Sequence, residues 1–124
     1  MDITTSKLQG RVAVTVLRVH GVVDSSTYQE FSAALRKAVE AGGDHILLDL
    51  SQVTYMSSAG IRSLNEFSLL LKKKYPQEHG DPGPRSNRLK LLNPQDRVFD
   101  ALKMSGVGTF FETHTNLEQA VASF

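Results

Sequence analysis

A short apolar run at residues 46–48 lies within a predicted strand, residues 45–50, between two segments with helical periodicity. Apolar residues recur at helical spacing over residues 28–39 before it and over residues 61–71 after it. A strand that is buried on both faces reads as a continuous apolar run, because crossover helices cover both faces of a parallel sheet. The chain is therefore predicted to adopt an α/β fold with this strand at the centre of the sheet.

Other segments extend this alternation of strands and helices. Residues 3–8 and 12–20 predict two strands joined by a turn at residues 9–11, which places an antiparallel hairpin at the N-terminus. The remaining predicted elements are a strand at 88–92, a helix from Asn93-Pro94 to Gly106, a short edge strand at Phe110-Phe111 and a terminal helix after Thr115. The predicted order is ββαβαβαβα, a mixed and mostly parallel sheet with right-handed crossovers and about four helices.

Capping and stop signals predict where the helices begin and end. Ser25, Ser26 and Thr27 are candidate N-caps of the first helix, and Ser26 with Gln29 matches a capping box. Gly42-Gly43 is a stop signal at the C-terminus of that helix. Pro76 predicts the end of the second helix, and Leu69 and Leu70 widen its apolar stripe. For the third helix, Asn93 is the predicted cap, Pro94 the first residue and Met104 part of the apolar face.

Composition narrows the class of protein. The 124 residues, 40% hydrophobic and 22% charged, indicate one globular domain over residues 1–124. There is no cysteine, which excludes disulfides, thiolate metal sites and a cysteine nucleophile. The N-terminus shows no secretion signal and no window reaches the roughly 20 apolar residues of a membrane span, so we expect a cytoplasmic protein. The four histidines, which share no metal-ligand spacing, are His20, His45, His79 and His114.

Positive charge is concentrated in one segment. The net charge is +1, but residues 72–90 hold six basic and two acidic side chains. Within this segment, residues 76–87 contain three of the four prolines and predict an exposed, mobile loop. The basic residues, which could form an anion-binding patch or a solvated charge run, are Lys72, Lys73, Lys74, Arg85, Arg88 and Lys90. Such a loop lacks the broad basic face with interleaved aromatics of a nucleic-acid-binding domain, so we expect no direct nucleic-acid contact.

Two adjacent hydroxyls, Ser57 and Ser58, lie where the central strand and a loop lead into the second predicted helix. A helix N-terminus favours a phosphate through its unpaired N–H groups and its dipole. The position therefore indicates a serine that another protein modifies. The alternative is that the two hydroxyls only cap the helix, which contributes about 1 kcal/mol.

The stretch from Asp49 to Ile61, D-L-S-x-V-x-Y-M-x-S-x-G-I, resembles the signature of STAS domains of the bacterial anti-sigma factor antagonist type. The segment Gly21-Val22-Val23-Asp24 looks like a G-x-hydrophobic-D element of that family, and Leu92-Asn93-Pro94 looks like its later strand-to-helix turn. The resemblance extends over nearly the whole chain and implies the STAS fold. The loop at 73–87 is longer than the usual family connection.

The resemblance also implies a function, partner switching in signal transduction and transcription regulation. The unphosphorylated domain would bind an anti-sigma factor with serine kinase activity, and phosphorylation would release it until a serine phosphatase restored binding. Aligning Met56 and Gly60 with the signature places the phosphorylatable serine at Ser58, and Ser57 is a rival acceptor because it stands where the family often has Asp. The implied partner-binding surface comprises Asp24, Ser57, Ser58, Gly60, Ile61 and Arg62. We expect no catalysis, no cofactor and a monomer, because no separate apolar stripe remains for a dimer.

Other functions rest on weaker patterns. Asp24 and Asp49 each follow or end a predicted strand, so their carboxylates could converge to bind a metal ion or to act in general acid/base chemistry. Alternatively, Asp24 assists a helix cap and Asp49 fixes a turn. A small-ligand or nucleotide-sensing module on the same fold is a second hypothesis, but the phosphate-cradling loop that would support a nucleotide site is missing from the sequence. An enzyme is the third hypothesis, and it ranks last because no nucleophile, base and orienting group can be assembled from this sequence.

Overall fold

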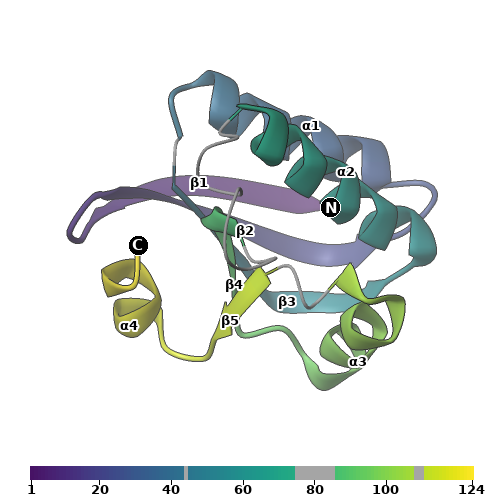
Figure 1. Ribbon diagram of the computed structural model, residues 1–124. Helices are drawn as coiled ribbons and strands as arrows, with labels where there is room; N and C mark the ends of the chain where they lie inside the picture. Colours follow the sequence, from purple (N-terminus) through teal and green to yellow (C-terminus); the bar gives the residue numbers. More distant parts are fainter. Residues whose placement is uncertain (44, 75–85, 108–110) are drawn as a thin grey trace.

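Nine elements follow one another in the predicted order ββαβαβαβα (Figure 1). The computed structural model describes residues 1–43, 45–74, 86–107 and 111–124. The elements are β1 (Asp2–Gln9), β2 (Ala13–Val23), α1 (Tyr28–Glu40), β3 (Ile46–Met56), α2 (Ser58–Lys74), β4 (Ser86–Leu92), α3 (Asp96–Ser105), β5 (Phe111–His114) and α4 (Leu117–Ala122). None of the helices in these ranges is long and apolar enough to cross a membrane.

The five strands form one mixed sheet in the order β1-β2-β3-β4-β5. β1 pairs antiparallel with β2, and every later pair is parallel. The predicted α/β fold, with an N-terminal hairpin on a mostly parallel sheet, is thereby confirmed. The β2–β3 pairing runs from Thr15↔Ile46 to Val23↔Met56, so these two strands end together at one edge of the sheet.

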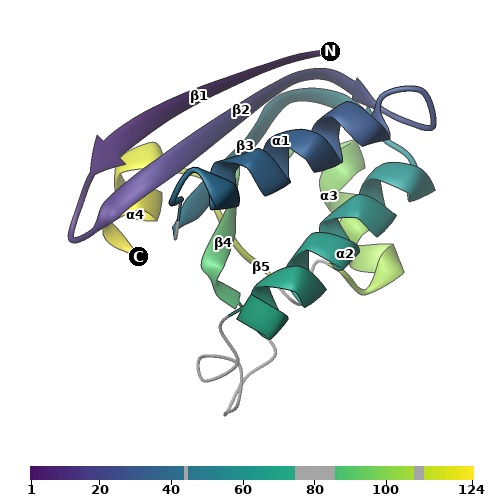
Figure 2. The ribbon, with the colours of Figure 1, turned by 90° about the horizontal axis from the view of Figure 1, so that it is seen from above.

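Helices cover both faces of the sheet. α1 and α2 lie side by side over one face, as Figures 1 and 2 show, and bury Phe31, Leu35 and Leu64 against Leu48 and its neighbours. Val98 and Leu102 of α3 join the same apolar cluster. On the opposite face, α4 contributes Ala120 and Val121 to a smaller cluster with Val14, Val16, Leu47 and Leu92. This two-sided burial explains the continuous apolar run 46–48.

Lys90 in β4 is buried, with 3% of its surface exposed. Its Nζ donates to the carbonyl oxygen of Ser123 at 2.9 Å and to the Ser123 hydroxyl at 3.0 Å, and lies 3.4 Å from a Glu112 carboxylate oxygen. The same ammonium lies 4.7 Å from the ring centre of Phe124. Burial acts to raise the pKa of Glu112, but Lys90 and His114 outweigh it and hold that pKa below its ordinary value. Lys90 therefore ties the end of α4 to the sheet.

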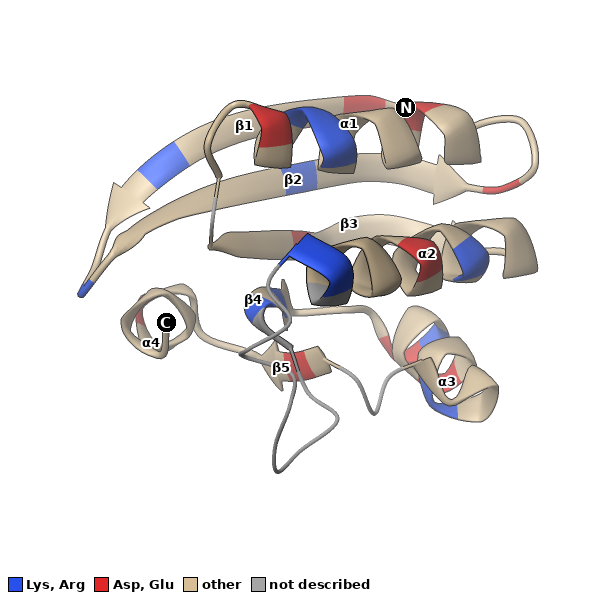
Figure 3. Cartoon of the chain, turned by 45° about the horizontal axis from the view of Figure 1, so that its top comes forward, with Lys and Arg blue, Asp and Glu red and all other residues tan. Residues whose placement is uncertain are grey.

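This environment corrects the predicted anion-binding patch, because a buried and paired Lys90 cannot belong to it. Arg88 lies beside the ring of His45, with 3.3 Å between Nη1 and Nε2. Arg85, Pro76, His79 and most of the predicted 76–87 loop lie outside the described residues, as does Phe110. Over the rest of the chain, basic and acidic positions are interspersed on helices and strands (Figure 3).

β3 is longer than predicted. It continues from the apolar run to Met56, because Val53 and Met56 are buried and pair with Gly21 and Val23 of β2. The polar residues at 51–54 had indicated a loop, but the parallel partner strand satisfies the backbone there.

Two predicted helix caps are wrong, by two residues at α3 and by one at α4, and the capping box predicted at the start of α1 is not formed. α1 is preceded by Thr27, and the Ser26 hydroxyl donates to Asp24 at 2.7 Å, so there is no Ser26–Gln29 capping box. Asn93 has φ of 52°, so the chain turns sharply after β4 and α3 begins only after Gln95. Asn116 caps α4 in place of Thr115, since its side chain accepts from the Gln119 N–H.

Two of the predicted helix stops are confirmed, but three residues predicted to lie on apolar helix faces are exposed. The stops at Gly42 and Gly106 are confirmed, with φ of 91° and 82° in the left-handed region that suits glycine. Leu69, Leu70 and Met104 do not belong to buried stripes, because 55%, 42% and 90% of their surfaces are exposed.

Lys90→Ala is expected to lower the free energy of unfolding by about 2–3 kcal/mol, because it leaves the Ser123 carbonyl and Glu112 without their buried cation. Denaturant unfolding monitored by circular dichroism measures the change. The matched control is Lys103→Ala, an exposed lysine on α3, for which a change within about 0.5 kcal/mol is expected. Equal losses in the two variants would show that Lys90 does not hold α4.

Candidate functional site

The candidate site lies at the sheet edge where β2 and β3 end and α1 and α2 begin (Figure 1). Val23 pairs with Met56 at the last register position of the two strands. One residue further, the Ser57 N–H donates to the Val23 carbonyl at 2.8 Å. The start of α2 is thus fixed to the end of β2 through the backbone.

Ser57 caps α2. Its carbonyl accepts the first helical hydrogen bond, from the Ile61 N–H at 3.0 Å, and its hydroxyl oxygen accepts from the Ala59 N–H at 3.2 Å. The side chain is half-buried. The hydroxyl therefore satisfies a backbone donor that the helix leaves unpaired.

Ser58 is the first residue of α2 and is exposed. Within the described ranges, its hydroxyl takes part in no hydrogen bond, in contrast to that of Ser57. It lies in the first turn, where the positive end of the helix dipole favours an anion. The two rival acceptor serines thus differ in geometry: one hydroxyl is engaged in a cap, and the other is directed to an open position.

Gly60 permits a close contact between α2 and the strand ends. A Cβ atom there would lie 2.6 Å from Cγ1 of Val23 and 2.8 Å from Cγ of Met56. Real Cβ atoms essentially never make such short contacts, and Gly60 is buried. It therefore sets how closely the first turn of the helix approaches the sheet.

Asp24 organises the loop between β2 and α1. Its carboxylate accepts from the Ser26 hydroxyl at 2.7 Å, from the Ser26 N–H at 2.9 Å and from the Thr27 hydroxyl at 3.3 Å. The hydrogen bonds from Ser26, with a smaller contribution from Thr27, lower the pKa of Asp24 below its ordinary value. The carboxylate is therefore ionised at neutral pH, next to the residue that anchors α2.

The residues of the predicted partner surface differ in their exposure to solvent. Arg62 and Ser58 are exposed, and Asp24 and Ser57 are half-buried. Ile61 is half-buried and packs against the main apolar cluster, so only part of its side chain is available at the surface. Partner contact by these residues stays a prediction. Because Gly60 is buried, it can contribute only by positioning the other residues.

Asp49 does not converge with Asp24, which corrects the predicted carboxylate pair. It lies in the middle of β3, in register with Arg18, and one carboxylate oxygen lies 3.5 Å from Arg18 Nε. The other oxygen accepts from the Ser51 N–H at 2.9 Å. Because β3 continues to Met56, Asp49 also does not fix a strand-to-loop turn. In the part of the chain that the structure describes, no three His, Asp or Glu side chains cluster as metal ligands would.

Tyr55, which precedes Met56 at the end of β3, has 45% of its surface exposed and was not among the predicted partner-surface residues. An exposed aromatic residue next to the candidate serines suits a protein interface, where tyrosine is enriched. The only signal in the sequence was the position of Tyr55 two residues before Ser57, because the predicted strand ended at residue 50.

Comparisons with known proteins identify a family and a relative. A family model described as "Mlab, STAS domain" matches residues 6–75. The chain is 29% identical over 124 residues to a protein of Bordetella bronchiseptica that is named as a candidate anti-sigma factor antagonist, BtrV, in a match covering 100% of this chain and 95% of BtrV.

Solved structures show the same fold. An anti-sigma factor antagonist from Mycobacterium paratuberculosis gives a TM-score of 0.74 at 20% identity, over 98% of this chain and 93% of that chain. The anti-sigma factor antagonist SpoIIAA of Bacillus, in its unphosphorylated form, gives a TM-score of 0.71 at 18% identity, over 97% and 93% of the two chains.

Ser57→Ala is expected to lower the free energy of unfolding by about 1 kcal/mol, because the Ala59 N–H loses its acceptor. Ser58→Ala, the matched control one residue away, is expected to change it by less than about 0.5 kcal/mol. Urea unfolding of both variants measures the difference. Equal effects would contradict the assignment of Ser57 as the cap.

Gly60→Ala is expected to destabilise the protein by about 1–3 kcal/mol, because the added methyl group overlaps Val23 and Met56 and pushes the first turn of α2 outward. The measurements are the unfolding midpoint and the amide chemical shifts of the first α2 turn. Ala59→Gly, at the neighbouring half-buried position, is the control and should leave the amide shifts of Val23 and Met56 nearly unchanged. Unchanged stability in Gly60→Ala would show that the contact is loose.

Proposed function

This chain belongs to the STAS domain family, and from that premise we propose that it is an anti-sigma factor antagonist that acts by partner switching. In its unphosphorylated state it binds an anti-sigma factor that is also a serine kinase, in the cytoplasm, and so displaces the partner that the kinase held. Phosphorylation of Ser58 ends this binding. A serine phosphatase removes the phosphate and returns the protein to its binding state.

The observation that carries the proposal is the contrast between two neighbouring serines. Ser58 presents a solvent-exposed hydroxyl at the first position of α2, whereas the hydroxyl of Ser57 caps the helix. A kinase can reach the first without disturbing the fold. Phosphorylation of the second would remove the acceptor of the Ala59 N–H from its place.

In the proposed reaction, the Ser58 hydroxyl oxygen forms an ester bond with the γ-phosphorus of ATP. The bond from that phosphorus to ADP breaks, and the hydroxyl proton passes to a base of the kinase. The phosphatase step is hydrolysis, which returns the serine and releases inorganic phosphate. The chain is substrate and binding partner in both steps, and it supplies no catalytic group.

The physical effect of phosphate would fall on the docking surface. A phosphoserine adds about −1.5 to −2 charges at pH 7, which the positive end of the α2 dipole tolerates. Ionised Asp24 lies in the neighbouring loop, so the phosphate adds to the negative charge of an edge whose exposed cation is Arg62. Bulk, desolvation and like-charge repulsion then oppose docking, while the backbone keeps one conformation. SpoIIAA, which shares the fold, has been solved in unphosphorylated and phosphorylated forms.

Phosphopeptide mapping tests this proposal. The protein is purified from its native host under several growth conditions and digested with trypsin, which releases residues 38–62 as one peptide. Fragment ions that separate residue 57 from residue 58 are expected to carry the phosphate on Ser58. Phosphate on Ser57 would contradict the assignment, and a peptide that stays bare while the kinase is expressed would contradict the switch.

Matched variants extend the test in the same host. Ser57→Ala is expected to remain phosphorylated despite its weaker cap, and Ser58→Ala is expected to carry no phosphate and to bind the kinase permanently. Co-purification of the kinase with each variant, identified by mass spectrometry, provides the second measurement. Release of the kinase from Ser58→Ala under conditions that phosphorylate the unchanged protein would refute partner switching at this site.

A further inference from the structure

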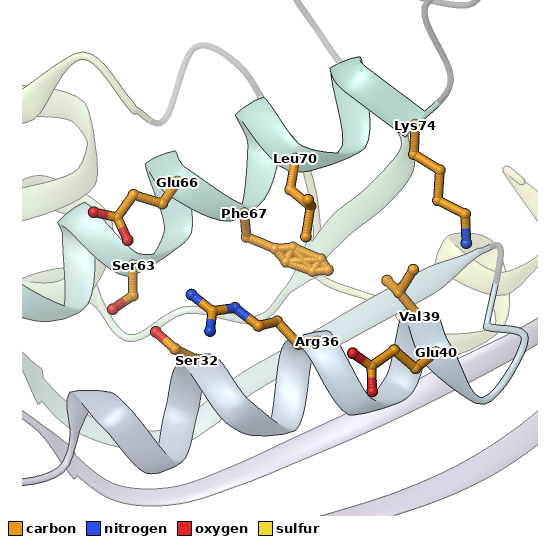
Figure 4. A pocket seen from close by; sticks show the side chains of 9 residues that line it. All are labelled: Ser32, Arg36, Val39, Glu40, Ser63, Glu66, Phe67, Leu70 and Lys74. Atoms are coloured by element: carbon orange, nitrogen blue, oxygen red, sulfur yellow. The ribbon is translucent and has the colours of Figure 1, made fainter.

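A groove between α1 and α2 encloses about 500 Å³ (Figure 4). It lies along the middle and C-terminal parts of the two helices, whereas Ser58 lies at the N-terminal end of α2. The proposed partner switching makes no use of it. A volume of this size is within the range of sites for small organic molecules.

The floor of the groove is apolar. Phe67 and Val39 are buried in the main cluster and line the groove from opposite helices. Leu70, from the next turn of α2, keeps 42% of its surface exposed in a position where the helical periodicity had predicted burial. The groove thus leaves apolar surface in contact with water that a bound apolar group would cover.

One part of the groove is polar and supplies hydrogen-bond donors. Ser32 and Arg36 lie one turn apart on α1, and Figure 4 shows the Arg36 guanidinium between the helices, directed toward Ser63 of α2. Within the described ranges, neither the Arg36 guanidinium nor the Ser32 hydroxyl takes part in a hydrogen bond or ion pair. The buried Ser63 hydroxyl donates to the Ala59 carbonyl at 3.1 Å. A guanidinium that can donate two parallel hydrogen bonds is complementary to a carboxylate.

Other charges limit what the groove can hold. Glu66 lies on the α2 side near Ser63, and Glu40 lies with Lys74 toward the other end (Figure 4). The two carboxylates offset the charges of Arg36 and Lys74, so the groove has no net positive charge to balance the several negative charges of a polyanion such as a nucleoside triphosphate. A ligand with one negative charge and an apolar body needs only one cation, which Arg36 supplies.

From these contacts we propose that the groove binds a small monocarboxylate, with the carboxylate at Arg36 and Ser32 and the apolar body over Val39, Phe67 and Leu70. This inference does not rest on the proposed partner switching, since it concerns another surface and another ligand. The two share only α2, which carries Ser58 at its start and Phe67 and Leu70 further along.

Titration with octanoate, followed through the methyl resonances of Val39 and Leu70, tests the proposal on the full chain. The expected result is saturable binding, with 1-octanol and octylammonium binding at least about tenfold more weakly because they lack the charge that Arg36 complements. Butyrate should also bind more weakly, because it covers less of the apolar floor.

Three variants assign the contacts. Arg36→Gln is expected to weaken octanoate binding at least about tenfold, and Leu70→Ser is expected to weaken it as well; both positions are exposed enough for the fold to tolerate the change. Arg97→Gln, an exposed arginine on α3, is the matched control and should bind octanoate as the unchanged protein does.

The proposal is overturned if octanoate shows no saturable binding, if 1-octanol binds equally well, or if Arg36→Gln binds unchanged. Methyl shifts at Val39 and Leu70 that follow protein concentration without octanoate would indicate a second copy in the groove, and would also overturn it. Phosphopeptide mapping of Ser58 is unaffected by each of these outcomes, so failure of one proposal is distinguishable from failure of the other.

Discussion

The parallel pairing of β2 with β3 determines where the second helix starts. The pairing ends at Val23↔Met56, and the next backbone group, the Ser57 N–H, donates to the Val23 carbonyl. Gly60 then lets the first helical turn approach both strand ends closely. These contacts involve only backbone and buried atoms. They fix the position of Ser58, but its exposed hydroxyl takes part in none of them.

Burial of both sheet faces requires a cover on each, and the two covers differ in kind. α1 and α2 cover one face with a large apolar cluster. The other face is covered by the six-residue α4, whose apolar contacts are few. A helix this short has little stability of its own, so the buried Lys90, with its hydrogen bonds to Ser123 and its ion pair with Glu112, adds the contacts that hold it.

Sequence patterns predicted the order of the elements because the period of apolar residues is a local property that burial imposes directly. The patterns failed where the local structure depends on residues that are distant in the sequence. The polar residues after Asp49 become strand because β2 pairs with them, and Lys90 is buried because Ser123 and Glu112 fold over it. The Ser26 capping box is not formed, and the Ser26 hydroxyl instead donates a hydrogen bond to the nearby Asp24 carboxylate. Of the site, the serine pair was predictable, but not which hydroxyl the helix uses.

The roles of the two serines follow from helix geometry. The residue before a helix can turn its side chain back to accept from the backbone N–H groups of the first turn, and Ser57 does so. Ser58, the first helical residue, is exposed, and among the described residues its hydroxyl makes no hydrogen bond. A phosphate at position 58 is therefore stabilised by the helix dipole and leaves the capping hydrogen bond of Ser57 in place. A phosphate at position 57 would have to replace that hydrogen bond. The fold itself thus favours modification at the second serine, because only there does a large change in surface charge leave the underlying contacts intact.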